Sequence, residues 1–116
     1  IFCGVNLSHT NFQEADLNEA DLRGATVSKA NFHGANLRNA RLTGLDLRKV
    51  NLSEAELSGA DLSGANLQQA DLTDAEMCET NLKDANLEDA QLKGTPLDRS
   101  SNPVRNRISR WMPGKR

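Results

Sequence analysis

Few residues in this chain have the chemistry of a catalyst or of a metal site. The sequence holds two histidines, His9 and His33, and two widely separated cysteines, Cys3 and Cys78. It contains neither a glycine-rich phosphate loop nor a closely spaced set of cysteine and histidine ligands. Carboxylates are abundant, since 16 acidic residues stand against 14 basic ones for a formal net charge of −2. We therefore expect no enzyme, no cofactor and no metal site, and the carboxylates are the remaining candidates for a functional surface.

The elements that must position these side chains are set by a five-residue word, A-[D/N]-L-x-x. The stretch GADLSGANLQQADL, residues 59–72, is typical. Every fifth residue from Phe2 to Leu97 is apolar, and the residue two positions before it is mostly alanine. An internal repeat of this kind decides the fold before any other signal.

A helix cannot use this spacing, because a step of five residues turns the side chain by about 140° and scatters the leucines around the axis. An extended segment can use it, because residues two apart point to the same side. Alanine and leucine then face inward together, and the last two residues of the word turn a corner. The repeat predicts a coil whose straight sides pair with the coils above and below.

On these residues the chain resembles the pentapeptide-repeat proteins, over residues 1–99. The resemblance implies an all-β solenoid, a right-handed quadrilateral β-helix with four words in each coil, and therefore about five coils here. One observation supports a twenty-residue coil independently: Gly4, Gly24, Gly44 and Gly64 recur at that spacing. We expect them to stack along one corner, where glycine tolerates positive φ and close backbone approach.

The narrow interior predicts specific packing. Phe12 and Phe32 are expected to stack in adjacent coils. Leu45 and Val50 enlarge the small position of the word, and we expect their smaller neighbours one coil away to compensate in volume. Those neighbours are Ala25, Ala30, Ala65 and Ala70. Flat sides are expected to leave no pocket.

The two thiols and the hydropathy of the chain indicate in which cellular compartment the protein is expected. Cys3 and Cys78 should point outward from coils too far apart for a disulfide. Unpaired thiols favour a reducing compartment, so we expect a cytoplasmic protein. The thylakoid lumen or the periplasm is the alternative if a targeting segment has been removed. No run of apolar residues is long enough to predict membrane insertion.

Residues 100–116 depart from the repeat and predict a second, short element. Asn102 is a suitable N-cap, Pro103 suits the first turn of a helix, and Pro113-Gly114 ends it. We expect a capping helix that covers the end of the solenoid with one apolar face, made of Val104, Ile108, Trp111 and Met112. The six basic residues from Arg99 onward leave open a tail that binds nucleic acid or a membrane surface.

Charge is uneven along the solenoid. Residues 54–98 hold eleven acidic and two basic residues, a net charge of −9, whereas residues 1–53 hold five acidic and six basic ones. Sorted by side of the coil, the acids gather on two adjacent sides. The candidate interaction surface consists of Glu54, Glu56, Asp71, Asp74, Glu76 and Glu79. A solvated face that keeps the rod dissolved would show the same pattern.

The fold of a repeat protein does not determine which partner the protein binds. We expect a non-enzymatic rod that binds or scaffolds a protein partner, without nucleic acid, and whose end can support association of two copies. The resemblance supplies an alternative, because some family members mimic duplex DNA and inhibit DNA gyrase.

Overall fold

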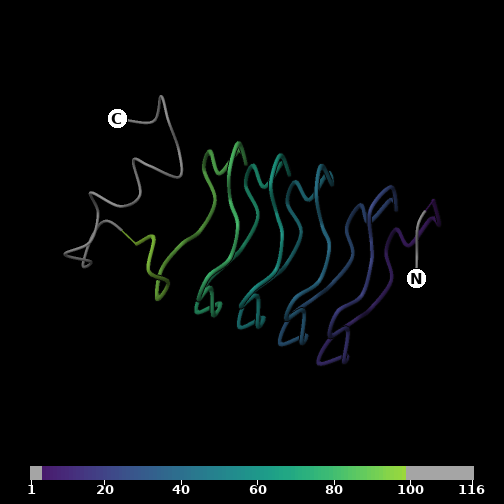
Figure 1. Cartoon of the computed structure of the whole chain (residues 1–116), viewed down its shortest axis with the longest axis horizontal. Helices are drawn as coiled ribbons and strands as arrows, with labels where there is room; N and C mark the ends of the chain where they lie inside the picture. Colours follow the sequence, from purple (N-terminus) through teal and green to yellow (C-terminus); the bar gives the residue numbers. More distant parts are fainter. Residues whose placement is uncertain (1–3, 99–116) are drawn as a thin grey trace.

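The computed structural model describes residues 4–98, which wind into coils stacked along one axis (Figure 1). Parallel β-bridges join residues twenty positions apart, from Asn6 with Thr26 at one end to Asp71 with Gln91 at the other. Each bridge is a single residue between two turns, and residues 4–98 contain neither a helix nor a longer strand. The spacing confirms the twenty-residue coil predicted from the repeat.

Each word forms one side of a coil, and we name the four sides by the central residues of their words. Side A has Leu22, Leu42, Leu62 and Leu82 at its centre, and side B has Leu7, Val27, Leu47, Leu67 and Leu87. Side C has Phe12, Phe32, Leu52, Leu72 and Leu92, and side D has Leu17, Leu37, Leu57, Met77 and Leu97.

The corner between two sides is a tight turn. The backbone N–H that opens the next word donates to the carbonyl of the central residue, as from Ala35 to Phe32 at 3.0 Å. The residue just before that N–H has positive φ at every corner from Gly4 to Gly94, which is the requirement of a type II turn. Twelve of these corner residues are not glycine. Each such residue costs on the order of 1–3 kcal/mol, so the surrounding bonds must hold it in place.

The Asp or Asn of the word closes the turn from outside. Its side-chain oxygen accepts the N–H two residues later, as from Gln13 to Asn11 at 2.9 Å and from Lys83 to Asn81 at 3.0 Å. The hydrogen bond satisfies a backbone donor that the coils above and below do not reach. The second position of the word is therefore selected by the turn rather than by the core.

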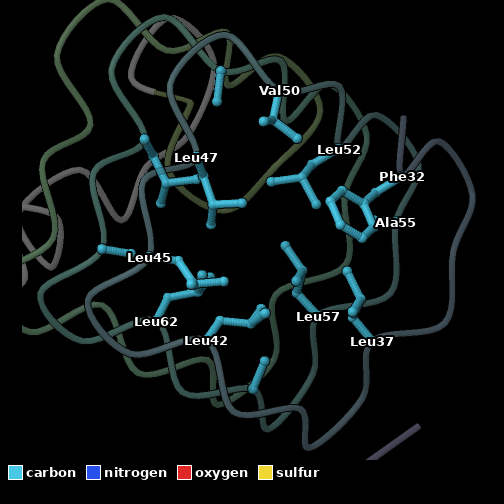
Figure 2. Close-up of a cluster of buried hydrophobic side chains, with 14 of the residues drawn as sticks. Phe32, Leu37, Leu42, Leu45, Leu47, Val50, Leu52, Ala55, Leu57 and Leu62 are labelled. Atoms are coloured by element: carbon cyan, nitrogen blue, oxygen red, sulfur yellow. The ribbon is translucent and has the colours of Figure 1, made fainter. Parts of the chain in front are cut away.

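Alanine and the central residue of each word face the interior, where they form one continuous core (Figure 2). In the middle of the rod this burial is nearly complete: Leu57, Leu62 and Leu67 are 0 % exposed. Burial of such a side chain stabilises a fold by about 1.5–3 kcal/mol. Toward the first described coil the central residues are only half-buried, because no described coil covers them there.

Gly4, Gly24, Gly44 and Gly64 share the corner after side A and all have positive φ, as predicted, but a Cβ built on Gly44 would meet no atom of Gly24 within 4 Å. Gly24 has φ of +78°, and a Cβ built on it would lie 3.5 Å from the backbone nitrogen of Gly4. At another corner, Gly59 is covered by the side-chain oxygen of Asn39, which a Cβ would displace. A corner side chain thus extends along the rod over the corner of the next coil.

The backbone ladder ends at Glu76 on side D, and in the interior of the rod it is interrupted on side B. Thr26 is bridged to Asn6 and Asp46 is bridged to Asn66, but Thr26 and Asp46 are not bridged to each other. The interior explains the break, because three inward positions grow at this single step. They change from Ala25, Val27 and Ala30 to Leu45, Leu47 and Val50.

At the next step Leu47 meets Leu67 and the ladder is intact. The compensation expected around Leu45 and Val50 is therefore incomplete. Both residues are buried, at 3 % and 0 % exposure, but on side B the coil that holds them is not bridged to the smaller coil beside it.

The predicted capping residues Val104, Ile108, Trp111 and Met112 lie outside the described residues, so the cap remains a prediction, as do the count of five coils and the division at residue 99.

Candidate interaction surface

The six acidic residues of the candidate surface lie on two adjacent sides. Side C carries Glu54, Asp71 and Asp74, and side D carries Glu56, Glu76 and Glu79. Glu56 and Glu76 are bridged across neighbouring coils, so their side chains leave the rod one above the other. Glu54 and Asp74 occupy the same corner one coil apart, and both have φ of 58°.

Two of the six carboxylates have local partners. Asp71 accepts hydrogen bonds from the backbone N–H and the hydroxyl of Thr73, at 3.0 and 2.6 Å. Glu56 forms an ion pair with Arg38 at 3.2 Å. Asp71 therefore helps to close a turn, and Glu56 is partly neutralised at the boundary with the less acidic half of the rod.

The other four carboxylates, on Glu54, Asp74, Glu76 and Glu79, belong to exposed residues. No ion pair holds them among residues 4–98. These four are the part of the acidic surface that is available to a partner. Sequence reasoning did not separate the four from Asp71 and Glu56, because it did not account for the bond that closes the turn at Asp71 or for the ion pair of Glu56 with Arg38.

His33 has a hydroxyl partner that the sequence did not reveal. Its Nδ1 lies 2.7 Å from Oγ of Ser53, one coil away, and that hydroxyl in turn donates to Oδ1 of Asn51 at 2.6 Å. Because the Ser53 proton is used toward Asn51, the histidine Nδ1 is the donor in the first bond. The imidazole therefore does not act as a base toward Ser53, and the pair links two coils. The twenty-residue spacing of His33 and Ser53 was the signal available in the sequence.

Two ion pairs on the surface of the rod lie within residues 1–53. The Arg23 guanidinium donates two hydrogen bonds to the Asp21 carboxylate, at 2.9 and 2.7 Å, and holds the pKa of that carboxyl far below its ordinary value of 3.8. Arg48 binds Asp46 in the same way, at 2.8 and 2.7 Å, and lowers its pKa. In both, arginine and aspartate are two residues apart on one side, so each arginine reinforces the turn that the aspartate closes.

The sides of the rod are not wholly flat, contrary to the expectation from the repeat. A shallow hollow of 480 Å³ lies on side B, and a second of 370 Å³ lies on side A. Within residues 4–98, no three His, Cys, Asp or Glu side chains are placed to hold a metal ion. No helix in this range could cross a membrane.

Comparison with known proteins relates this architecture to a protein family. The family model "Pentapeptide repeats" matches residues 1–39, 30–69 and 60–99. No curated protein sequence matches the chain.

Two solved structures are similar to the chain. A pentapeptide repeat protein from the Arabidopsis thaliana thylakoid lumen is 32 % identical, with a TM-score of 0.65 over 96 % of this chain and 76 % of that one. A pentapeptide repeat protein from Nostoc PCC 7120 is 38 % identical, with a TM-score of 0.54 over 73 % of this chain and 62 % of that one. The chain thus spans only part of each.

A more distant likeness is to QnrB1, a plasmid-mediated fluoroquinolone resistance protein. It is 18 % identical, with a TM-score of 0.46 over 81 % of this chain and 63 % of that one, which is too weak to support an argument.

The family implies the right-handed quadrilateral β-helix expected from the resemblance, and its members are generally non-enzymatic structural or binding proteins. With matches that run through residues 1–99 and a coil in which each word forms one side, the chain belongs to the pentapeptide-repeat family.

Proposed function

We propose that the chain is a non-enzymatic binding or scaffold rod and that the four exposed carboxylates of Glu54, Asp74, Glu76 and Glu79 contact a basic surface of a protein partner. The observation that carries the proposal is that these carboxylates are exposed on adjacent sides of one hydrogen-bonded segment and form no ion pair with any residue from 4 to 98. Four like charges held close together attract a cationic surface and repel an anionic one.

The rigidity of the segment supports recognition of a partner. Each of these residues stands on a backbone that is hydrogen-bonded to a neighbouring coil or closed by a turn. Little conformational entropy is therefore lost from the backbone when a partner binds. A charged surface of this kind contributes more to the specificity and the rate of association than to the affinity of the complex.

A photo-crosslinking amino acid at position 76, with the same label at Gln13 as control, tests the proposal. Gln13 is exposed on side C in the first part of the rod. In a lysate of the source organism, we expect a discrete protein adduct from position 76 and none from position 13. The adduct should vanish when Glu54, Asp74 and Glu79 are changed to Gln, Asn and Gln. An adduct that survives these changes, or identical adducts from both positions, would refute the acidic surface.

The second candidate is a DNA-mimicking regulator of DNA gyrase. Its support is the stacking of carboxylates at the spacing of the coils, as in Glu56 and Glu76, in a segment of net charge −9. Duplex DNA has one charge per about 1.7 Å along its whole axis. The first half of this rod has no such excess, so the candidate ranks second. A gyrase supercoiling assay decides: inhibition at micromolar protein, lost on neutralising the four exposed carboxylates, would favour the mimic.

For location and assembly, we propose a cytoplasmic protein, with the lumen or periplasm as alternative. The exposed, unpaired thiol of Cys78 supports a reducing compartment, whereas the likeness to the Arabidopsis lumen protein supports the alternative. Association of two copies through an end of the solenoid is also proposed, because stacking of coil on coil is how the repeats of a solenoid bury their interior. Sedimentation at increasing protein concentration tests it.

A further inference from the structure

The hollow on side B lies away from the acidic surface and is lined by polar residues from three successive coils. They are Ser28 and Lys29, then Asp46, Arg48 and Lys49, then Gln68 and Gln69. Its volume of 480 Å³ falls within the range of about 300–1,000 Å³ that is usual for small-molecule sites.

This hollow coincides with the interruption of the backbone ladder. The N–H groups of Val27 and Lys29 form no hydrogen bond with the next coil, whereas the equivalent N–H groups of Leu47 and Lys49 donate to Asn66 and Gln68 at 2.7 and 3.1 Å. On side B the coil that holds Leu45 and Val50, whose inward residues are larger, is not bridged to its neighbour. The hollow lies at this step, and Lys29, whose N–H has no partner in the next coil, is one of its lining residues.

The charge of the hollow is positive and unbalanced. Arg48 and Asp46 satisfy each other through two hydrogen bonds. That leaves Lys29 and Lys49, which make no ion pair with any other described residue. The two lysines occupy the same corner in adjacent coils, at the step where the backbone ladder of side B is broken. An anion that lies between the two ammonium groups would interact favourably with both.

The remaining lining residues supply hydrogen-bond donors. Gln68 and Gln69 each carry an amide NH₂, and Ser28 carries a hydroxyl. A phosphate group offers several acceptor oxygens and as much as two negative charges, which matches two ammonium groups and neutral donors better than a single carboxylate does.

We propose that the hollow on side B binds the phosphate group of a small molecule between Lys29 and Lys49. The remaining volume, flanked by Gln68 and Gln69, accommodates the rest of that molecule. The site is independent of the acidic surface, so it stands even if the proposed function fails.

The probes are inorganic phosphate and pyrophosphate, titrated into ¹⁵N-labelled protein at constant ionic strength. We expect saturable shifts confined to the amides around Lys29, Lys49 and Gln69. Lys29→Gln and Lys49→Gln should each weaken binding by about tenfold or more, because each removes a charge-assisted hydrogen bond. Gln69 already occupies the same corner with φ of 62°, so glutamine fits the backbone at positions 29 and 49.

Two controls complete the experiment. Lys83→Gln makes the same charge change on side A and should leave the affinity unchanged, and Lys29→Arg should retain binding. Equal affinity in the double variant Lys29→Gln/Lys49→Gln, or equal binding of succinate, would overturn the phosphate site. Shifts spread evenly over all basic residues would overturn it as well, since they report general attraction of anions.

Discussion

Phe12 and Phe32 stack face to face across adjacent coils of side C, with ring centroids 5.1 Å apart and planes 7° from parallel. The twenty-residue coil places the two Cα atoms one above the other, so the rings share an orientation. This confirms the pairing expected from the repeat. The contact joins a half-buried ring in an early coil to one that is 1 % exposed.

The two rings should therefore contribute unequally. Phe32→Ala is expected to lower the free energy of unfolding by about 3–5 kcal/mol, because it leaves a cavity in the core. Phe12→Ala should cost clearly less, since that ring is half-buried. Urea denaturation of both variants measures the difference, and equal losses would contradict it.

The phase of the coil is tested on side A. Leu62 is 0 % exposed, whereas Thr43 stands one position after a central residue, on the outer surface. Leu62→Asp buries a carboxylate and should cost more than about 4 kcal/mol, which is enough to unfold the rod. Thr43→Asp introduces the same group and should change the melting temperature little. Similar tolerance of the two changes would show that the assignment of inward positions is wrong.

The closing of the turns by Asx side chains is tested at Asn81. Its Oδ1 accepts the Lys83 N–H at 3.0 Å on an exposed side. Asn81→Ala should cost about 0.5–1.5 kcal/mol, the net value of one hydrogen bond. Asn81→Asp keeps the acceptor and serves as the matched control. Chemical denaturation compares them, and the bond has no importance for stability if the alanine variant equals the parent.

The Asp21–Arg23 pair predicts a pH dependence with a definite sign. A carboxyl whose pKa is lower in the folded state stabilises the fold above its unfolded pKa, and this contribution is lost as pH falls through the folded value. Arg23→Gln removes the main cause of the shift and should raise the pKa of Asp21 toward 3.8. Carboxyl-carbon NMR titration measures it. The difference in stability between variant and parent should be greatest near neutral pH and should disappear in strong acid.

The control for that titration is Arg48→Gln, on side B, which should raise the pKa of Asp46 and leave Asp21 unchanged. An Asp21 titration that is the same with and without Arg23 would mean that the ion pair does not persist in solution.

Cys78 is exposed and unpaired. A thiol reagent should therefore modify it in the native protein as fast as in a denatured sample, and mass spectrometry of the digested product identifies the site. Cys78→Ser supplies the blank. Protection of Cys78 in the native protein would indicate that side D is covered, for example by a second copy.

The sequence predicted the solenoid because one pattern decides nearly every inward position. Alanine two residues before leucine has no satisfactory arrangement other than an extended side followed by a corner, so the core of side A or side D follows from the word alone. The acidic residues could be assigned to sides C and D by the same arithmetic.

What the word did not predict depends on interactions between coils. The hydrogen bond that the Gln13 N–H donates to Oδ1 of Asn11 explains why Asp or Asn precedes the central residue, and the residue types alone did not show it. The break between Thr26 and Asp46 arises from three modest size differences that add up at one step, each of them tolerable alone. The hollow at Lys29 and Lys49 follows from that break, so it was not foreseen.

The pairing of residues twenty positions apart also determines what insertions and deletions do to the rod. Removing one whole coil would shorten the rod and leave every later residue on its original side. Removing a single word would keep the inward pattern intact but rotate all later residues by a quarter turn, so that the acids of side D would continue the column of a different side. Chains with equally good cores can therefore display entirely different surfaces, and a change of five residues is enough to exchange them.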